Sequence, residues 1–250
     1  MPRSERKKSS SGIYHVMLRG INRQTIFKDK EDNEKFLEVL NDCKVLSEFE
    51  LFGYCLMGNH VHLLIREGKE SLGFLFKRIG ARYVFWYNRK YKRCGHLFQD
   101  RYRSEAVETD PYFVVVLRYI HQNPMKAGLC KSLNKYEWSS YNEYIQRRGI
   151  VDYEFAIDII GENRFESFMN EKKNDKCLEI AEPGDHLLDA ELALRIEEVF
   201  KIKAIMIQNE PKESRNYILT AALRIKGVSI RQLSRVTGIS INTIWRVTNG

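Results

Sequence analysis

Two histidines stand two residues apart in the segment GNHVHLLI, residues 58–65. In a β-strand, residues i and i+2 point to the same face, so His60 and His62 would project side by side while Val61 packs on the other side. Two imidazoles on one strand form half of a divalent metal site. A pair of buried, hydrogen-bonded histidines is the alternative, and the bare HxH spacing does not exclude it.

The segment RYIHQNP, residues 118–124, contains groups that complete such a site. Tyr119 and Asn123 are four residues apart and would share one face of a helix. Asn123 offers an oxygen, which suits Mg²⁺ or Mn²⁺, and Tyr119 offers a nucleophilic hydroxyl. A metal that polarises a phosphoryl oxygen would let this phenol attack phosphorus. His121 faces away from Tyr119 and is interpreted as a surface or supporting group. A packed aromatic is the alternative for Tyr119.

The elements that must position these residues follow the order β-α-β-β-α-β-α. Apolar alternation indicates strands and i, i+3, i+4 spacing indicates helices. Asp110 is expected as an N-cap with Pro111 behind it, and Pro124 is expected to stop that helix near Gln122 or Asn123. This pattern predicts an α+β fold, a ferredoxin-like antiparallel sheet with helices on one face. The ranges are strands at 13–19, 49–57 and 60–67, a strand or irregular ribbon at 96–108, and helices at 29–49, 71–91 and 110–123.

Residues 77–103 are both basic and aromatic, with nine Lys or Arg, one Asp and seven aromatic residues. Basic groups neutralise phosphates and aromatic faces stack on unpaired bases, which favours single-stranded nucleic acid. An amphipathic helix with its aromatics in the core is the alternative, and Phe85 and Trp86 are expected to pack inward. The candidates for contacts with the DNA backbone are Arg82, Arg89, Lys90, Lys92, Arg93, Arg101 and Arg103.

The net charge of +8 is unevenly distributed. Residues 1–160 carry 27 basic and 20 acidic residues, 161–210 carry 7 and 12, and 211–250 carry 7 and 1. Two basic modules that flank an acidic connector suggest a polyanionic partner. No apolar run is long enough for a membrane span. Five scattered cysteines without a CxxC pair fit a reducing, cytoplasmic compartment.

The last segment, SIRQLSRVTGISINTIWRVTNG, predicts two short helices packed across a turn. Ser229 and Ser240 are expected as N-caps and Gly238 as the turn residue. This is a helix-turn-helix pattern, whose second helix enters the major groove and would present Asn242, Thr243 and Arg246 to duplex DNA. A plain helical hairpin that only packs on the rest of the protein is the alternative.

Four segments carry a family resemblance: YHVMLRGINRQTIF, MGNHVHLLI, GHLFQDRYRSE and LRYIHQNPMKAGL. In this order and spacing they resemble the single-tyrosine HUH transposases (IS200-like), and most closely the REP-associated tyrosine transposases. The resemblance covers roughly residues 12–145 and rests on several separate motifs. Relatives often read RGN where this chain has RGI, with Asn22 one place later.

The resemblance implies a Mg²⁺- or Mn²⁺-dependent transposase that cleaves and rejoins single-stranded DNA at hairpin-forming repeats. Its tyrosine becomes joined to a 5′ phosphate and leaves a 3′ hydroxyl. Tyr119 matches the nucleophile, His60 and His62 match the metal-binding histidines, and Asn123 matches the polar third ligand. Arg19 is a further candidate for DNA contact.

The expected organisation is a flexible basic tail (1–11), a catalytic domain (12–160), an acidic linker (161–188) and a helical DNA-binding module (189–250). Two rivals stay open at this point. One is a non-catalytic DNA-binding protein or repressor derived from the same fold, and the other is an RNA-binding module on the same sheet. A homodimer is possible, and the sequence does not decide whether the tyrosine serves its own subunit.

Overall fold

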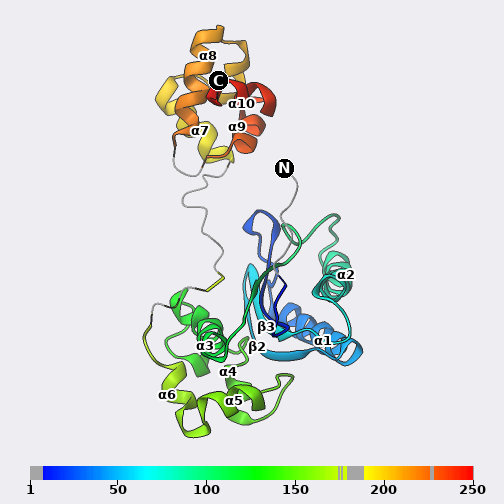
Figure 1. Ribbon diagram of the computed structural model, residues 1–250. Helices are drawn as coiled ribbons and strands as arrows, with labels where there is room; N and C mark the ends of the chain where they lie inside the picture. The colour runs from blue at the N-terminus through cyan, green and yellow to red at the C-terminus, as the bar shows by residue number, and fades with distance from the viewer. Residues whose placement is uncertain (1–7, 174, 176, 179–188, 226–227, 250) are drawn as a thin grey trace. The chain divides into compact units, whose positions relative to one another are not determined.

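The computed structural model describes residues 8–173, 175, 177–178, 189–225 and 228–249. The chain divides into two compact units, Met1–Leu178 and Glu179–Gly250, each with its own apolar core (Figure 1). Most of the tail expected at 1–11 and the linker stretch at 179–188 lie outside the described residues. Among the described helices, none is both long and apolar enough to span a membrane.

The first unit is built on a four-stranded antiparallel sheet with the strand order β2-β3-β1-β4. The strands are β1 (Ile13–Arg19), β2 (Glu50–Met57), β3 (His60–Arg66) and β4 (Arg103–Ala106). The β2–β3 pair is joined through Gly58 and Asn59, as the sequence predicts. With the two crossover helices, this order is the ferredoxin-like arrangement, so the predicted fold class is confirmed.

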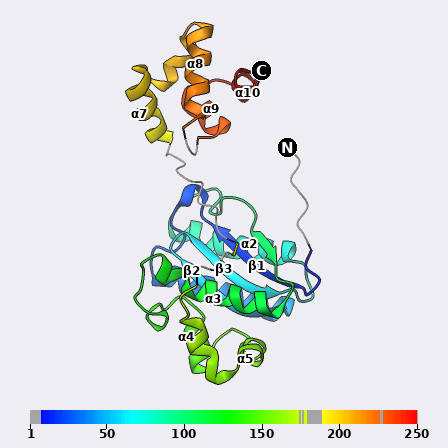
Figure 2. The same cartoon turned by 60° about the vertical axis from the view of Figure 1, so that its left-hand side comes forward.

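The two crossover helices lie on one face of the sheet, and a third helix covers the other (Figures 1 and 2). The crossovers are α1 (Lys30–Ser47), preceded by the short 3₁₀ helix η1 (Ile21–Arg23), and α2 (Leu72–Lys90). The third is α3 (Asp110–Lys126), which packs on β2 because Gly53 lacks a side chain. A Cβ at Gly53 would lie 2.7 Å from Cδ1 of Leu117. The expectation that the helices share one face is therefore wrong for α3.

Helix α3 begins one residue earlier and ends about one turn later than predicted. Thr109, not Asp110, is the N-cap, and its side chain accepts a hydrogen bond from the Tyr112 amide. Pro124 lies inside the helix, which continues to Lys126, instead of stopping it. A proline removes one hydrogen bond from a helix interior, and here it is buried in the core, where tertiary packing holds the last turn in place.

The predicted acidic linker begins too early. After η2 (Leu133–Lys135), α4 (Tyr141–Gln146) and α5 (Glu154–Ile160), the chain forms η3 (Glu162–Arg164) and α6 (Phe165–Met169). Phe165 and Met169 are buried in the first core, because their i, i+4 spacing places both on one helix face. Two acidic residues beyond them, Glu171 and Asp175, pair with Arg118, which is 1% exposed. This part of the range belongs to the first unit.

The second unit is entirely helical in its described residues. It contains α7 (Asp189–Phe200), η4 (Ala204–Asn209), α8 (Lys212–Leu223), α9 (Ile230–Thr237) and α10 (Ile241–Asn249). Ser229 and Ser240 accept hydrogen bonds from the amides of Gln232 and Thr243, and Gly238 ends α9 with φ of 74°. These are the cap and turn positions that the sequence predicts.

Candidate active site

The two histidines of β3 project from the same face of the sheet, as their spacing predicts. The ring centroids of His60 and His62 are 5.0 Å apart, and His62 is buried. Arg19 lies opposite His60 in the register between β1 and β3, at the end of the sheet next to the β2–β3 turn. The site is therefore fixed by backbone pairing of two central strands, and not by a loop.

A third histidine, His15 on β1, contacts this pair. Its Nε2 lies 3.0 Å from Nδ1 of His62, and both side chains are buried. His15 was not among the residues that the sequence singled out. Its local signal was present, because alternation along IYHVMLR places His15, Met17 and Arg19 on one face of the strand. What the sequence lacked was the register that brings His15 next to His62.

Burial keeps all three imidazoles in their neutral form at ordinary pH. Desolvation lowers the pKa of His15 to about 3. Desolvation, with a smaller effect of the Arg19 charge, lowers the pKa of His60 to about 4. The pKa of His62 is held well below its usual value by burial first and then by its two histidine neighbours. Neutral imidazole is the form that binds metals.

Tyr119 of α3 lies against the same rings. Its ring centroid is 5.7 Å from that of His62 and 5.8 Å from that of His15, and the tyrosine is 5% exposed. The Nζ of Lys126 lies 4.8 Å from the centre of the Tyr119 ring. The structure thus brings together the predicted nucleophile and the predicted histidine pair from elements that are more than 50 residues apart in sequence.

Asn123 lies one turn beyond Tyr119 on α3 and is half-buried. Its Nδ2 donates a hydrogen bond to the Tyr119 carbonyl at 3.1 Å, which leaves Oδ1 as its acceptor. Among the described residues, no group of three His, Cys, Asp or Glu side chains could hold a metal ion. A site here would accordingly be two imidazoles and one amide oxygen, completed by substrate or water.

The hydrogen bonds around the histidines fit metal binding. Nδ1 of His60 lies 2.6 Å from Oδ1 of Asn59, and Nδ1 of His62 faces His15. When one ring nitrogen of a histidine is hydrogen-bonded in this way, the ring is held so that its other nitrogen can bind a metal ion. Nε2 is that nitrogen on both rings, so the donor set suits a divalent cation that accepts nitrogen and oxygen, such as Mn²⁺.

Of the two interpretations of His121, a surface residue or a supporting group, the surface one is wrong. It is 1% exposed, its Nε2 lies 2.9 Å from Oγ of Ser140, and burial lowers its pKa to about 3. It faces Tyr141, Tyr144 and Phe165, away from Tyr119. Its role is to fix α3 to the segments that follow it.

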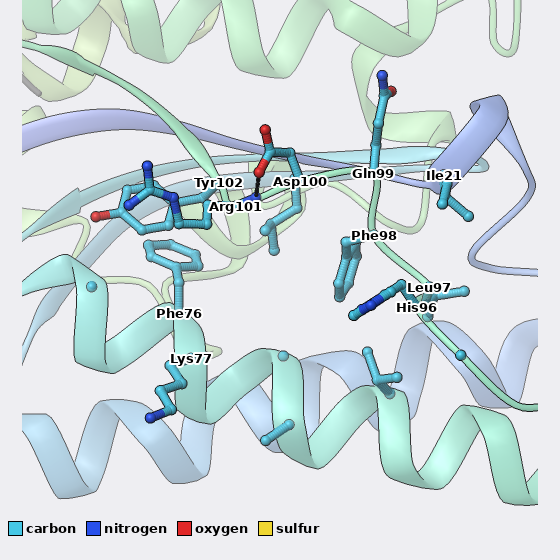
Figure 3. Close-up of a pocket in the computed structure, with 16 residues that line it drawn as sticks. Ile21, Phe76, Lys77, His96, Leu97, Phe98, Gln99, Asp100, Arg101 and Tyr102 are labelled. Atoms are coloured by element: carbon cyan, nitrogen blue, oxygen red, sulfur yellow. Dashed lines mark hydrogen bonds between the residues drawn. The ribbon is translucent and has the colours of Figure 1, made fainter. Parts of the chain in front are cut away.

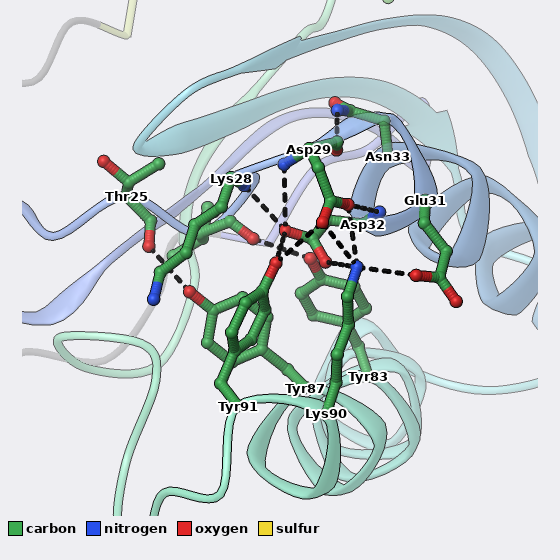
Figure 4. A network of polar contacts seen from close by, with 11 residues as sticks. Thr25, Lys28, Asp29, Glu31, Asp32, Asn33, Tyr83, Tyr87, Lys90 and Tyr91 are labelled. Atoms are coloured by element: carbon green, nitrogen blue, oxygen red, sulfur yellow. Dashed lines mark hydrogen bonds and ion pairs between the residues drawn. The ribbon is translucent and has the colours of Figure 1, made fainter.

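Lys90 is held inside the protein, although the sequence suggests that it contacts DNA. Its Nζ forms ion pairs with Asp29 at 2.7 Å, Glu31 at 2.8 Å and Asp32 at 2.9 Å (Figure 4). Tyr91 donates a hydrogen bond to Asp32 at 2.8 Å. These carboxylates raise the pKa of Lys90 above its usual value, although burial opposes them. The contacts fix the end of α2 to the start of α1.

The other members of the basic segment have different surroundings. Arg82 lies 3.6 Å from Asp42, and Arg93 donates to the His96 carbonyl at 3.1 Å. Phe85 is 72% exposed and does not pack inward, whereas Trp86 packs partly against the core as expected. The candidates with exposed side chains are Arg82, Arg89, Lys92, Arg101 and Arg103.

On α10, Asn242 and Arg246 are exposed and Thr243 is half-buried. The Oγ1 of Thr243 lies 2.9 Å from Oγ of the N-cap Ser240. Trp245, beside them, is 57% exposed, whereas Ile244 is fully buried. The helix therefore has one packed face and one more exposed face, which carries the three predicted residues together with Ile241 and Trp245.

Comparisons with known proteins identify the family of the segment that carries the candidate active-site residues. Residues 8–123 match the family model described as "Transposase IS200 like", and this range contains His60, His62, Tyr119 and Asn123. The N-terminal domain of this chain belongs to the IS200-like transposases. No curated protein matches the chain.

Two solved structures are similar to the chain. The first is a REP-associated tyrosine transposase bound to a REP hairpin, with 16% identity and a TM-score of 0.52 over 72% of this chain and 100% of its own. The second, from Deinococcus radiodurans R1 and also described as a transposase, has 15% identity and a TM-score of 0.34 over 58% of this chain and 96% of its own. The first similarity shows that the fold is that of a transposase.

Proposed function

We propose that the protein is a metal-dependent transposase that cleaves and rejoins single-stranded DNA through a covalent 5′-phosphotyrosine. The observation that carries this proposal is the packing of Tyr119 against the paired histidines, with ring centroids 5.7 Å apart between Tyr119 and His62. A tyrosine that only filled the core would not need the imidazoles of His15 and His62 against its ring. A nucleophile beside a metal site does need them.

His60, His62 and Asn123 would hold a Mg²⁺ or Mn²⁺ ion. When bound, this ion supplies Lewis-acid polarisation of a phosphoryl oxygen. His15 keeps Nδ1 of His62 engaged, which directs Nε2 toward the ligand position. Burial of these imidazoles keeps them unprotonated and therefore able to bind the cation.

The hydroxyl oxygen of Tyr119 attacks the scissile phosphorus and loses its proton. The bond between phosphorus and the 3′ oxygen of the preceding nucleotide breaks, and that oxygen takes up a proton and leaves as a free 3′ hydroxyl. The 5′ phosphate stays on Tyr119. Since one phosphodiester replaces another, a different 3′ hydroxyl can attack the phosphotyrosine and rejoin the strand.

The exposed cations of α2 and of residues 92–103 would bind the DNA backbone, since they are free to reach phosphates. The related transposase was solved with a REP hairpin, and we expect a hairpin-forming repeat as the substrate here. The five cysteines are free, which fits action in the reducing cytoplasm, where chromosomal DNA lies.

The second unit would tether the enzyme to duplex DNA through the face of α10 that carries Asn242, Thr243 and Arg246. Its caps and its Gly238 turn follow the helix-turn-helix pattern. Arg246→Ala in the full chain should weaken duplex binding about tenfold, with adduct formation on a single-stranded hairpin unchanged. Equal duplex affinity of variant and wild type, measured by fluorescence anisotropy, would remove α10 from the DNA interface.

Tyr119 is proposed to act on the metal site of its own chain, because it packs on His15 and His62 of that chain. A mixture of Tyr119→Phe and His60→Ala proteins tests this directly. Each variant lacks one half of the site, so the mixture should stay inactive. Activity in the mixture would show that a dimer exchanges its tyrosine helices.

A denaturing gel with end-labelled single-stranded hairpins tests the nuclease. With Mn²⁺ we expect a covalent protein–DNA band that disappears with EDTA and in Tyr119→Phe. Tyr112→Phe is the matched control, since Tyr112 lies on the same helix outside the histidine cluster. Tight binding without a covalent band would favour the rival function, a non-catalytic DNA-binding protein with the same fold.

A further inference from the structure

A cavity lies on the face of the sheet opposite α3, between α2 and the segment 95–102 (Figure 3). Gly80 and Ala81, in the middle of α2, line it. The cavity volume is about 700 Å³, within the usual range for ligand sites. We call this cavity the α2 slot.

Glycine is a poor residue for a helix interior, yet a Cβ at Gly80 would meet nothing within 4 Å. Close packing around α2 therefore does not explain the glycine. The open slot does, because a larger side chain at this lining position would fill it.

Aromatic rings form the walls of the α2 slot. Figure 3 shows Phe76 on one side and Phe98 on the other, with His96 beside Phe98. Phe76 is backed by Tyr102, with ring centroids 4.6 Å apart, and Phe98 by Tyr83 at 6.4 Å. These contacts hold the walls in place. Flat rings are good stacking partners for a nucleobase.

The rim of the slot is polar and carries cations. Lys77 and Arg101 line it and are exposed, as is His96. In an aqueous groove, such cations suit the phosphates on either side of a bound base. A neutral apolar partner would gain nothing from them.

Backbone hydrogen bonds link one wall of the slot to the end of the sheet that holds the histidines. The amide of Ile21 donates to the Leu97 carbonyl at 2.9 Å, and the amide of Gln99 donates to the Arg19 carbonyl at 2.8 Å. The amide of Gly20 in turn donates to the Asn59 carbonyl at 2.9 Å, next to His60. One short backbone network therefore connects the slot to the candidate metal ligands.

We propose that the α2 slot binds an unpaired nucleobase of the DNA strand that the enzyme cleaves. This inference rests on the proposed function for its choice of DNA as the occupant. The base stacks on Phe98, and its flanking phosphates meet Lys77 and Arg101. The slot thereby holds the single-stranded flank of a hairpin while the scissile phosphate reaches Tyr119.

Gly80→Leu places a large side chain in the slot without removing any existing contact, and it puts a better helix former in α2. Gly80→Ala is the matched control, because it gives the same helix benefit and leaves most of the cavity open. The probes are a fluorescent DNA hairpin with a single-stranded tail of about ten nucleotides and the same hairpin with a blunt end. Full-length proteins are titrated in EDTA, so that no cleavage occurs.

We expect Gly80→Leu to weaken binding of the tailed hairpin by roughly tenfold or more, as for the loss of one base stack. Binding of the blunt hairpin, and both affinities of Gly80→Ala, should stay at the wild-type values. Unchanged affinity of Gly80→Leu for the tailed hairpin, or equal weakening for both hairpins, would overturn the proposal.

Phe98→Leu provides a second and independent variant, since it removes the stacking face and keeps an apolar side chain. It should also weaken binding of the tailed hairpin selectively, and equal affinity with wild type would count against the slot. The covalent assay separates the two proposals. If the wild-type protein forms no adduct, the nuclease proposal is refuted, and binding of the tailed hairpin still decides whether the slot binds a base. If the adduct forms normally and both variants bind the tailed hairpin as tightly as wild type, only the slot proposal is refuted.

Discussion

The two faces of the sheet are built from the same strands but from different kinds of residue. On the α3 face, β1 and β3 present His15, Arg19, His60 and His62. On the α1–α2 face, the same strands present only apolar or aromatic residues: Tyr14, Val16, Leu18, Val61, Leu63 and Ile65. One strand pair therefore serves both as a hydrophobic wall and as a support for the reactive groups.

The difference shows where the protein tolerates buried polar groups. On the α3 face imidazoles are buried in direct contact with one another, which is unfavourable unless each nitrogen finds a partner. On the other face, within the described part of the chain, the fully buried carboxylate is Asp32, and it pairs with Lys90, which Asp29 and Glu31 also contact. The first arrangement suits binding a cation, whereas the second only joins two helices.

The strongest test of this comparison is His62→Ala on the α3 face. Loss of one of two imidazoles should reduce metal-dependent adduct formation by more than about a hundredfold. Mn²⁺ binding should be lost in parallel. The electron paramagnetic resonance signal of free Mn²⁺ measures this binding. A variant that binds Mn²⁺ as tightly as wild type would show that the histidines are a structural pair.

His15→Leu separates orientation from direct ligation. It should weaken Mn²⁺ binding by about 10- to 100-fold, the usual effect of losing a partner behind a metal ligand. His15→Gln keeps a hydrogen-bonding group next to Nδ1 of His62 and should recover part of this loss. Equal affinities in the two variants, at equal thermal stability, would contradict a positioning role.

Lys90→Met and Arg89→Met are neighbouring substitutions with opposite expected effects. Lys90→Met leaves the buried carboxylate of Asp32 without its ammonium and should lower the free energy of unfolding by about 2 kcal/mol. Arg89→Met should change it by less than about 0.5 kcal/mol and should instead reduce the salt dependence of DNA binding. Urea unfolding and a salt titration measure both, and a reduced salt dependence of DNA binding in Lys90→Met but not in Arg89→Met would reverse the assignment.

His121 gives a smaller, pH-dependent effect. Its folded-state pKa of about 3 lies below the usual value of 6.5. Between these values the unfolded chain binds the proton and the folded chain does not, so stability is complete above the usual pKa and falls with acidification. From about pH 7.5 to about pH 5 this histidine should cost roughly 2 kcal/mol. Between the two pH values, the free energy of unfolding of His121→Gln should therefore fall by roughly 2 kcal/mol less than that of wild type, as measured by urea unfolding. Equal decreases in the two proteins would contradict this.

Comparison of prediction and structure shows which parts of the fold are locally encoded. The first three strands, the Gly58–Asn59 turn and the caps at Ser229 and Ser240 were predictable, because period and turn chemistry act over a few residues. Of the strand or irregular ribbon expected at 96–108, only Arg103–Ala106 forms a strand. The ends of α3 and the boundary of the linker were not. Pro124 and Phe165 owe their positions to packing with distant segments, which overrides local preference.

The sequence by itself determined that His60 and His62 share a face, that Tyr119 and Asn123 share another, and that the family is that of the IS200-like transposases. Strand and helix periods are local properties, so they can be read without knowing the fold. Only the tertiary structure decided that His15 completes the cluster, that Lys90 is held by carboxylates, and that Gly80 leaves an open slot. Each of these depends on register or on packing between segments that are distant in sequence, and burial then sets the charge state of the groups involved.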